Sequence, residues 1–367
     1  MCFLTAVLTL AAMSLILLGY CGGKEGLAFI SKLNTVRAVI EEKYVGEVDW
    51  DAAADGAAEG LVSAVGDRWS YYLTAEEYLS YMDRSNNSTN GIGVTVLADE
   101  EGRGFLVISV VAGSPADRAG IKAGCILTAV AGRSIAGLDI GEVSHIIRAQ
   151  SGEYIIEYLD ASGNPCEATV SNEVIYTSPV EYTMLEGNAG YIRITDFEKG
   201  AAADGIAAIE DLMAQGADSI VFDVRSNPGG QLSELIDLLD YILPEGELFI
   251  SVDSEGEEEI YYSGESCIDI PMSVLIDANS YSAAEFFAAA LREYDYAAVV
   301  GEASTGKARS QQTFSLSDGS AVHISTRNYL TPNRVNLAEE GGLVPDIEVA
   351  LDGISDTQLE KALEYLS

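Results

Sequence analysis

The sequence predicts a multidomain α/β protein, and three patterns in its 367 residues indicate this class. Apolar runs at residues 219–224 and 273–277 are typical of buried strands, and a helical pattern follows each of them closely. Residues 93–170 instead contain short strand-like runs separated by turns, which predict a β-rich domain. Residues 24–86 show helical spacing, so an N-terminal helical region is expected before both domains.

The composition is strongly acidic. The chain has 58 acidic and 20 basic residues, which gives a formal net charge of -38. Such a charge argues against nucleic acid or an anionic membrane surface as a partner and is typical of a strongly hydrated surface. The hydrophobic content of 48% argues against general disorder.

An uncharged apolar run occupies residues 2–20 and is long enough to cross a bilayer as a helix. We interpret residues 1–23 as either a cleaved signal segment or a membrane anchor. No lysine or arginine precedes the run, so the charge pattern does not support an outward-facing protein body.

The five cysteines form no C-x-x-C pair and no cluster with histidine. A zinc site therefore has no support, and we expect neither a metal nor another cofactor. Cys125 and Cys166 are expected to be either a pair within one domain or two free buried thiols.

Two helices are predicted at the start of the helical region. Apolar residues recur at helical spacing from Phe29 to Tyr44, and an alanine-rich helix is expected over residues 51–65. A third, shorter helix follows the capping box at residues 74–77 and is expected to bury Tyr78 and Met82.

The polar stretch at residues 85–90 is interpreted as a linker and as the plainest domain boundary. A β-rich domain is expected over residues 91–172. Its predicted strands lie at 93–97, 105–111, 126–130, 154–159 and 167–170, with a helix at 140–148.

An α/β domain is expected over residues 178–350, followed by a C-terminal helix at 357–366 within residues 351–367. Its predicted strands lie at 189–194, 219–224, 273–277, 297–300, 309–314, 321–326 and 328–330, and its predicted helices at 201–213, 232–242 and 283–293. No internal repeat interrupts this order.

Ser282 follows a predicted buried strand and precedes a predicted helix. Free backbone N–H groups and the positive end of the helix dipole at this point favour a negatively charged oxygen. Ser282 is therefore a candidate nucleophile. The alternative is a capping box, because residues 282–285 read S-A-A-E.

Lys307 lies in a glycine-containing loop just beyond the predicted strand at residues 297–300. An amine acts as a general base only when its pKa is lowered, and a loop packed against a buried strand provides the necessary desolvation. The alternative is an ordinary solvated loop lysine.

Three motifs together resemble those of the C-terminal processing peptidases, also called tail-specific proteases. They are S-A-A-E at residues 282–285, G-K at 306–307 and the glutamine Gln311. The resemblance implies a catalytic domain of crotonase-like type, with Ser282 as the nucleophile, Lys307 as the base and Gln311 orienting the lysine. Tyr281 departs from the family pattern, which has a small residue before the nucleophile.

Two further segments resemble parts of the same family. The stretch N-P-G-G at residues 227–230 implies that a backbone N–H of Gly229 or Gly230 joins that of Ala283 in an oxyanion hole, although glycines after a strand are also simple turns. The stretch G-D-R-W-S-Y-Y at residues 66–72 resembles the family's G-D-P-Y-S-x-Y turn, and its residues are expected to be structural.

The β-rich region, with S-P-A-D-R-A-G-I-K-A-G at residues 114–124, resembles a PDZ domain, a β-rich fold with two helices. PDZ domains bind a peptide as an added strand and hold its carboxylate in backbone N–H groups. The matching positions are Gly91, Ile92, Gly93 and Val94, and the alternative is a strand that begins with glycines.

The chain has only two histidines, so a Ser-His-Asp triad is disfavoured. His145 lies in the predicted helix of the β-rich domain and is expected to be structural, with a place in the peptide groove as the alternative. His323 lies on a predicted strand and is expected to be structural.

The resemblance implies a serine endopeptidase that captures protein C-termini on its PDZ domain and cuts upstream with a Ser/Lys dyad. It also implies an extracytoplasmic body held at a bacterial-type cell membrane by a single span, or secreted if that segment is cleaved. The alternative function is a catalytically silent, membrane-tethered PDZ scaffold. The sequence leaves a homo-oligomer open.

Overall fold

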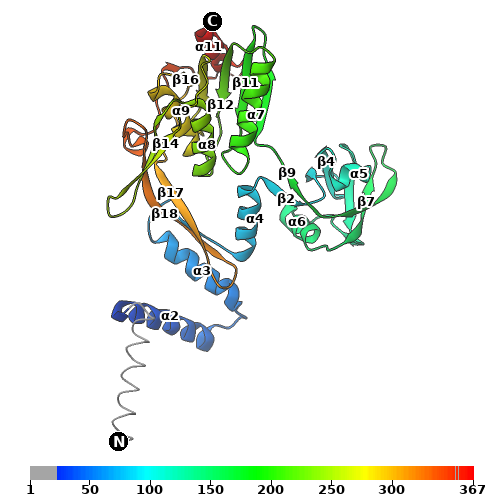
Figure 1. Ribbon diagram of the computed structural model, residues 1–367. Helices are drawn as coiled ribbons and strands as arrows, with labels where there is room; N and C mark the ends of the chain where they lie inside the picture. Colours follow the sequence, from blue (N-terminus) through cyan, green and yellow to red (C-terminus); the bar gives the residue numbers. More distant parts are fainter. Residues whose placement is uncertain (1–22, 352, 354) are drawn as a thin grey trace, which may run out of the picture. The chain divides into compact units, whose positions relative to one another are not determined.

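The computed structural model describes residues 23–351, 353 and 355–367, and the chain divides into two units, Met1–Leu61 and Val62–Ser367 (Figure 1). The expected signal or anchor segment lies outside the described residues. Within the described part of the chain, no helix has the length and apolar character needed to cross a membrane.

The first unit contains helix α2 (Gly23–Lys43) and most of helix α3 (Trp50–Ser63). α3 begins where Asp49 accepts hydrogen bonds from the backbone N–H groups of the first turn. None of the α2 residues is buried. The guanidinium of Arg37 lies 4.8 Å from the ring centroid of Trp50.

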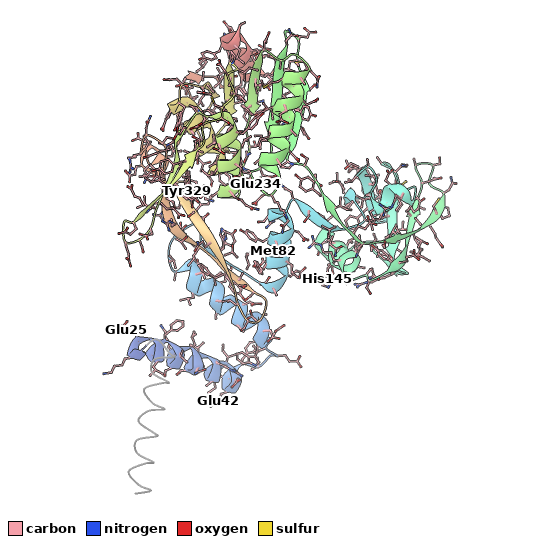
Figure 2. The ribbon with its side chains drawn as sticks, in the orientation of Figure 1. Glu25, Glu42, Met82, His145, Glu234 and Tyr329 are labelled. Carbon is pink, nitrogen blue, oxygen red and sulfur yellow. The ribbon has the colours of Figure 1, made fainter. Side chains whose placement is uncertain are left out.

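Strand β1 (Tyr71–Leu73) and helix α4 (Ala75–Ser85) follow in the second unit. The capping box predicted for α4 is present, because the Thr74 and Glu77 side chains bond to each other's backbone N–H groups. The predicted burial of Tyr78 and Met82 is wrong. α4 has no buried residue, and Met82, labelled in Figure 2, is 42% exposed because this short helix lies at the surface.

The predicted linker at residues 85–90 is also corrected. Residues Ser88–Gly91 form strand β2, which pairs in antiparallel register with β9 (Glu173–Tyr176). The polar composition therefore marks an exposed two-stranded ribbon whose backbone groups are satisfied by the partner strand.

A β-rich sheet in the order β3-β4-β5-β7-β8, with β6 paired to β5, lies between the two strands of this ribbon in the sequence. Its elements are β3 (Val94–Ala98), β4 (Phe105–Val110), α5 (Pro115–Arg118), β5 (Ile126–Val130), β6 (Arg133–Ser134), α6 (Ile140–Arg148), β7 (Glu153–Leu159) and β8 (Pro165–Ser171). Ile121, Leu127 and Ile156 form the centre of its core.

The α/β domain contains a six-stranded sheet in the order β10-β11-β12-β15-β16-β19, parallel except for β10. Its strands are β10 (Val180–Met184), β11 (Ala189–Ile194), β12 (Ser219–Asp223), β15 (Met272–Ile276), β16 (Ala297–Gly301) and β19 (Ile347–Glu348). Its helices are α7 (Ala201–Ala214), α8 (Leu232–Ile242), α9 (Ala283–Glu293) and α11 (Thr357–Leu366), and the first three are labelled beside the sheet in Figure 1.

The two faces of this sheet bury different helices. Phe222 points into the core shared with α7, α8 and α9, whereas the preceding Val221 packs with Ala362 of α11. This alternation follows from the two-residue period of a strand, and it explains why the strands read as continuous apolar runs.

A second sheet, in the order β1-β18-β13-β14 with β17 paired to β18, completes the domain. Its strands are β13 (Gly246–Val252), β14 (Glu258–Ser263), β17 (Arg309–Ser315) and β18 (Ala321–Leu330), and the short helix α10 (Leu337–Glu340) follows them. The two strands predicted at 321–326 and 328–330 are one continuous strand. β17 and β18 form the long orange hairpin of Figure 1, and β17 begins two residues after Lys307.

Candidate active site

Ser282 is the N-cap residue of α9 and is 7% exposed. Its backbone has φ 59° and ψ −125°, a conformation that is costly for a residue with a side chain. The turn before it is fixed by Ser280, whose Oγ donates to the Val224 carbonyl at 2.7 Å and accepts from the Asp277 N–H at 3.0 Å. The strain is therefore held by the two strands β12 and β15, at whose ends this turn lies.

Glu285, one turn into α9, is completely buried. Its carboxylate accepts from the backbone N–H groups of Ser282 at 2.8 Å, Gly306 at 2.6 Å and Lys307 at 2.9 Å, and from the Ser304 hydroxyl. Burial raises the pKa of Glu285, and these hydrogen bonds oppose that change. The capping carboxylate thus joins the serine turn to the lysine loop.

Lys307 is half-buried at the end of this loop. Burial lowers the pKa of its amine from 10.5 to about 8, although the negative charges of Glu285 and Asp67 act in the opposite direction. Its Nζ lies 4.8 Å from the ring centroid of Trp69 and 5.7 Å from that of Tyr281. The interpretation of Lys307 as an ordinary solvated lysine does not fit this environment.

The turn after β12 packs against Ser282. A Cβ added to Gly229 would lie 2.7 Å from the Ser282 Cβ and 2.9 Å from the Ala283 backbone N, so only glycine fits. The Gly229 N–H donates to the Asn227 Oδ1 at 2.8 Å, and the Tyr281 N–H donates to the Asn227 carbonyl at 3.1 Å. Asn227 therefore holds both turns together.

A cavity of about 700 Å³ brings the predicted residues together. Five of the six predicted catalytic and oxyanion-hole residues line it, namely Ser282, Lys307, Gln311, Gly229 and Gly230. The sixth, Ala283, is buried at the first position of α9.

Gln311 lines the cavity from β17. Its Nε2 donates to the Arg309 carbonyl at 2.9 Å and to the Ser325 Oγ at 3.0 Å. These bonds fix the amide on the hairpin, and the role of orienting Lys307 stays a prediction.

Sequence reasoning missed two groups in this cavity region. His323 of β18 lines the cavity, and burial together with the Lys307 charge lowers the pKa of His323 to about 4. Trp69 lies in the turn that was expected to be only structural. The strand pairing of Tyr71 with His323 brings these distant segments together, and a signal for that pairing is absent from the local sequence.

A second cavity, of about 180 Å³, lies between the β2–β3 segment and α6. Gly91, Ile92, Gly93 and Val94 line it, and their role in binding a peptide stays a prediction. The groove residues of α6 are Ser144, Ile147 and Arg148. His145, labelled in Figure 2, is exposed on α6 and outside this lining, so the alternative that placed it in the groove is wrong.

Comparisons with known proteins agree with this architecture. Residues 188–349 match peptidase family S41, and residues 106–156 match the PDZ domain. The fold and these matches define a serine-type peptidase that carries a PDZ domain. The α/β domain matches peptidase family S41, and the chain is similar to C-terminal processing proteases over most of its length. The exact domain boundaries given by the sequence stay predictions.

Two relatives are proteins of Bacillus subtilis (strain 168). The chain is 29% identical over 338 residues to carboxy-terminal processing protease CtpA, covering 91% of this chain and 72% of that protein. It is 29% identical over 329 residues to carboxy-terminal processing protease CtpB, covering 87% of this chain and 68% of that protein.

Two solved structures share the fold. The photosystem II D1 C-terminal processing protease is 25% identical, with a TM-score of 0.51 and 90% of each chain covered. A putative S41 protease from Bacteroides fragilis NCTC 9343 is 17% identical, with a TM-score of 0.53, covering 88% of this chain and 92% of that chain. The similarity to the Bacteroides fragilis protein concerns the fold alone.

Proposed function

We propose that this peptidase cuts protein substrates with a Ser282/Lys307 dyad after capturing their C-termini in the groove at Gly91–Val94. The observation that carries the proposal is the Glu285 carboxylate, which bonds to the backbone of both Ser282 and Lys307. A strained serine and a desolvated lysine are thereby held in one cavity.

The chemistry follows from these positions. Neutral Lys307 accepts the Ser282 proton as the hydroxyl oxygen attacks the scissile carbonyl carbon, and the resulting ammonium returns that proton to the leaving amine. The acyl-enzyme ester is then hydrolysed by water, with Lys307 again acting as base. Proton transfers of this kind need hydrogen-bond contact that often forms only in the substrate complex.

The oxyanion of the tetrahedral intermediate needs backbone donors beside Ser282. Ala283 supplies one N–H at the start of α9. We assign the second to Gly230, because the Gly229 N–H already donates to Asn227. Gly229 has no side chain, and its turn can therefore pack closely against Ser282.

The proposed substrates are proteins with accessible C-termini. The groove at residues 91–94 is bordered by α6, which suits an extended peptide added beside β3. For location, we propose an extracytoplasmic body, either anchored by the apolar run at residues 2–20 or secreted after its removal. Protease treatment of intact cells tests this, since an extracytoplasmic body is degraded and an internal one survives.

An unfolded test protein with a free C-terminus tests the enzymatic function. We expect the wild type to cleave it, and the Ser282→Ala and Lys307→Ala variants each to lose cleavage while binding C-terminal peptides normally. Mass mapping of the products locates the cuts. Equal turnover by Ser282→Ala would refute the dyad, and peptide binding without cleavage by the wild type would indicate a silent scaffold.

A further inference from the structure

Two aromatic rings cover the amine of Lys307. Its Nζ lies 4.8 Å from the Trp69 centroid and 5.7 Å from the Tyr281 centroid. The two rings are themselves in contact, with centroids 5.6 Å apart and planes inclined by 32°. One ring belongs to the residue before Ser282, and the other comes from a turn more than 200 residues away in sequence.

The Trp69 turn is fastened to the hairpin that follows Lys307. Asp67 accepts a hydrogen bond from the Ser70 hydroxyl at 2.6 Å, and the Ser70 Oγ accepts from the Ser325 N–H of β18 at 3.0 Å. Arg309, at the start of β17, lies 3.6 Å from Asp67. The Trp69 ring is therefore held in place by the element that begins just after Lys307.

Charged groups face the amine from several elements. Glu285 of α9, Asp67 of the Trp69 turn and Glu198 beyond β11 favour its protonated form, whereas Arg68 disfavours it. His323 of β18 also faces Lys307 and stays neutral above about pH 4. The Arg68 guanidinium lies 4.1 Å from the Trp69 ring centroid, so the same ring contacts two cations.

We infer that Trp69 and Tyr281 are positioning residues that hold the Lys307 amine beside Ser282 and keep bulk water from it. The inference rests on the proposed role of Lys307 as the base. An aromatic face attracts an ammonium by about 0.5–2 kcal/mol, which orients the amine, and the same ring removes water from it, which favours its neutral form. Desolvation dominates here, because the pKa of Lys307 lies below its ordinary value.

The test is the pH dependence of kcat/KM for Trp69→Phe, Trp69→Leu and Trp69→Ala. Phenylalanine keeps a ring, so we expect activity within about threefold of wild type. Alanine admits water and also lacks the aromatic face, so we expect its acid limb to move up by about one pH unit and its kcat to fall about tenfold. The loss is then approximately 100-fold at pH 7 and approximately tenfold at pH 10.

Leucine keeps the apolar cover but has no aromatic face. We expect its acid limb to stay within about 0.3 pH unit of wild type while kcat falls about tenfold, because the amine is no longer oriented. Tyr281→Leu should behave in the same way. An alanine variant whose acid limb coincides with that of the leucine variant, or a leucine variant with the kcat of wild type, would overturn the inference.

The matched control is Trp50→Ala, which removes a ring from a cation at the same 4.8 Å distance, in the Arg37–Trp50 pair of the first unit. We expect its acid limb to coincide with that of wild type. A cooperative urea unfolding transition shows that each variant is folded. If the proposed Ser282/Lys307 dyad is wrong, the result is different. Lys307→Ala would then retain wild-type activity, whatever the activity of the Trp69 variants.

Discussion

The Glu285 carboxylate binds the backbone of Lys307. Its Oε2 accepts the Lys307 N–H at 2.9 Å, and the same oxygen accepts the Ser282 N–H at 2.8 Å, although the lysine lies 22 positions along the chain. One buried side chain thus sets the separation between the serine turn and the lysine loop. Capping of α9 and assembly of the candidate active site depend on the same group.

Replacing Glu285 by alanine should disrupt both features. The variant leaves three backbone N–H groups and the Ser304 hydroxyl without their buried acceptor, so we expect a loss of roughly 3 kcal/mol in the free energy of unfolding. Proteolytic activity should fall at least about 100-fold, because the lysine loop is released from the serine turn. Urea unfolding and cleavage assays measure the two effects.

The control is Glu77→Ala, which breaks the exposed capping box of α4. We expect it to cost about 1 kcal/mol or less and to leave cleavage intact. Similar losses in the two variants would mean that Glu285 is only a helix cap.

The pH dependence of cleavage should report the Lys307 amine. Its pKa is lowered to about 8, and the base must be neutral, so kcat/KM should rise with pH through about 8 and then level off. A histidine base would give a limb near the His323 pKa of about 4 instead. Lys307→Arg should be inactive up to pH 10, since a guanidinium stays protonated.

The lowered pKa of Lys307 also affects the free energy of unfolding. Because the folded-state pKa of Lys307 is below the ordinary value of 10.5, the unfolded chain binds more protons between about pH 8 and 10.5. The contribution of Lys307 to the free energy of unfolding therefore rises with pH across this window. Lys307→Met should remove this rise, and an unchanged slope in that variant would contradict the assignment.

Arg225 joins the C-terminal helix to the catalytic sheet. Its guanidinium binds the buried Asp223 and also both carboxylate oxygens of Asp356, each at 2.8 Å. Arg225→Ala leaves the Asp223 charge buried without its cation, so we expect a loss of about 3–5 kcal/mol in urea unfolding. The exposed Arg334 bound to Glu258 is the control, and Arg334→Ala should cost less than about 1 kcal/mol.

The ion pair between Arg225 and Asp356 also predicts that the free energy of unfolding depends on pH. Hydrogen bonding to Arg225 lowers the pKa of Asp356 below 3.8. The stabilisation by Asp356 is therefore complete above its unfolded-state pKa and is lost as the pH falls through the lower folded-state value. Asp356→Asn should weaken the dependence of stability on pH in this acid range, and wild-type behaviour of that variant would contradict the proposed link.

Local patterns predicted the strand–helix units of the catalytic domain. Each unit is recognisable because a buried parallel strand is continuously apolar and the helix after it is amphipathic. This is why the elements around Ser282 and Gly229 could be placed from the sequence, and the structure brings both residues to one cavity with Lys307.

Features that depend on strand pairing between distant segments could not be predicted from the sequence. Trp69 meets Lys307 only because β1 pairs with β18, which places Tyr71 opposite His323. The bonds from Glu285 to the lysine loop were also missed, since the motif predicts the local helix cap but not a partner elsewhere in the chain. For α4 the prediction of burial was wrong. Helical spacing of apolar residues indicates a helix but does not guarantee that the helix packs on a core, and Met82 is exposed.

Gly229 gives a sharp test of the candidate oxyanion hole. Alanine there would adopt φ +88° and bring its Cβ within 2.7 Å of the Ser282 Cβ, so one of the two turns must move. We expect a loss of more than about 100-fold in kcat with a smaller change in KM, because displaced donors affect mainly the transition state.

Gly216→Ala separates this effect from simple backbone strain. Gly216 has a similar φ of +97°, but an added Cβ there meets nothing within 4 Å. We expect the control to lose about 1 kcal/mol or somewhat more in stability and to cleave normally. Comparable activity in the two folded variants would show that Gly229 serves only the turn, because both carry the strain and only Gly229 contacts the serine.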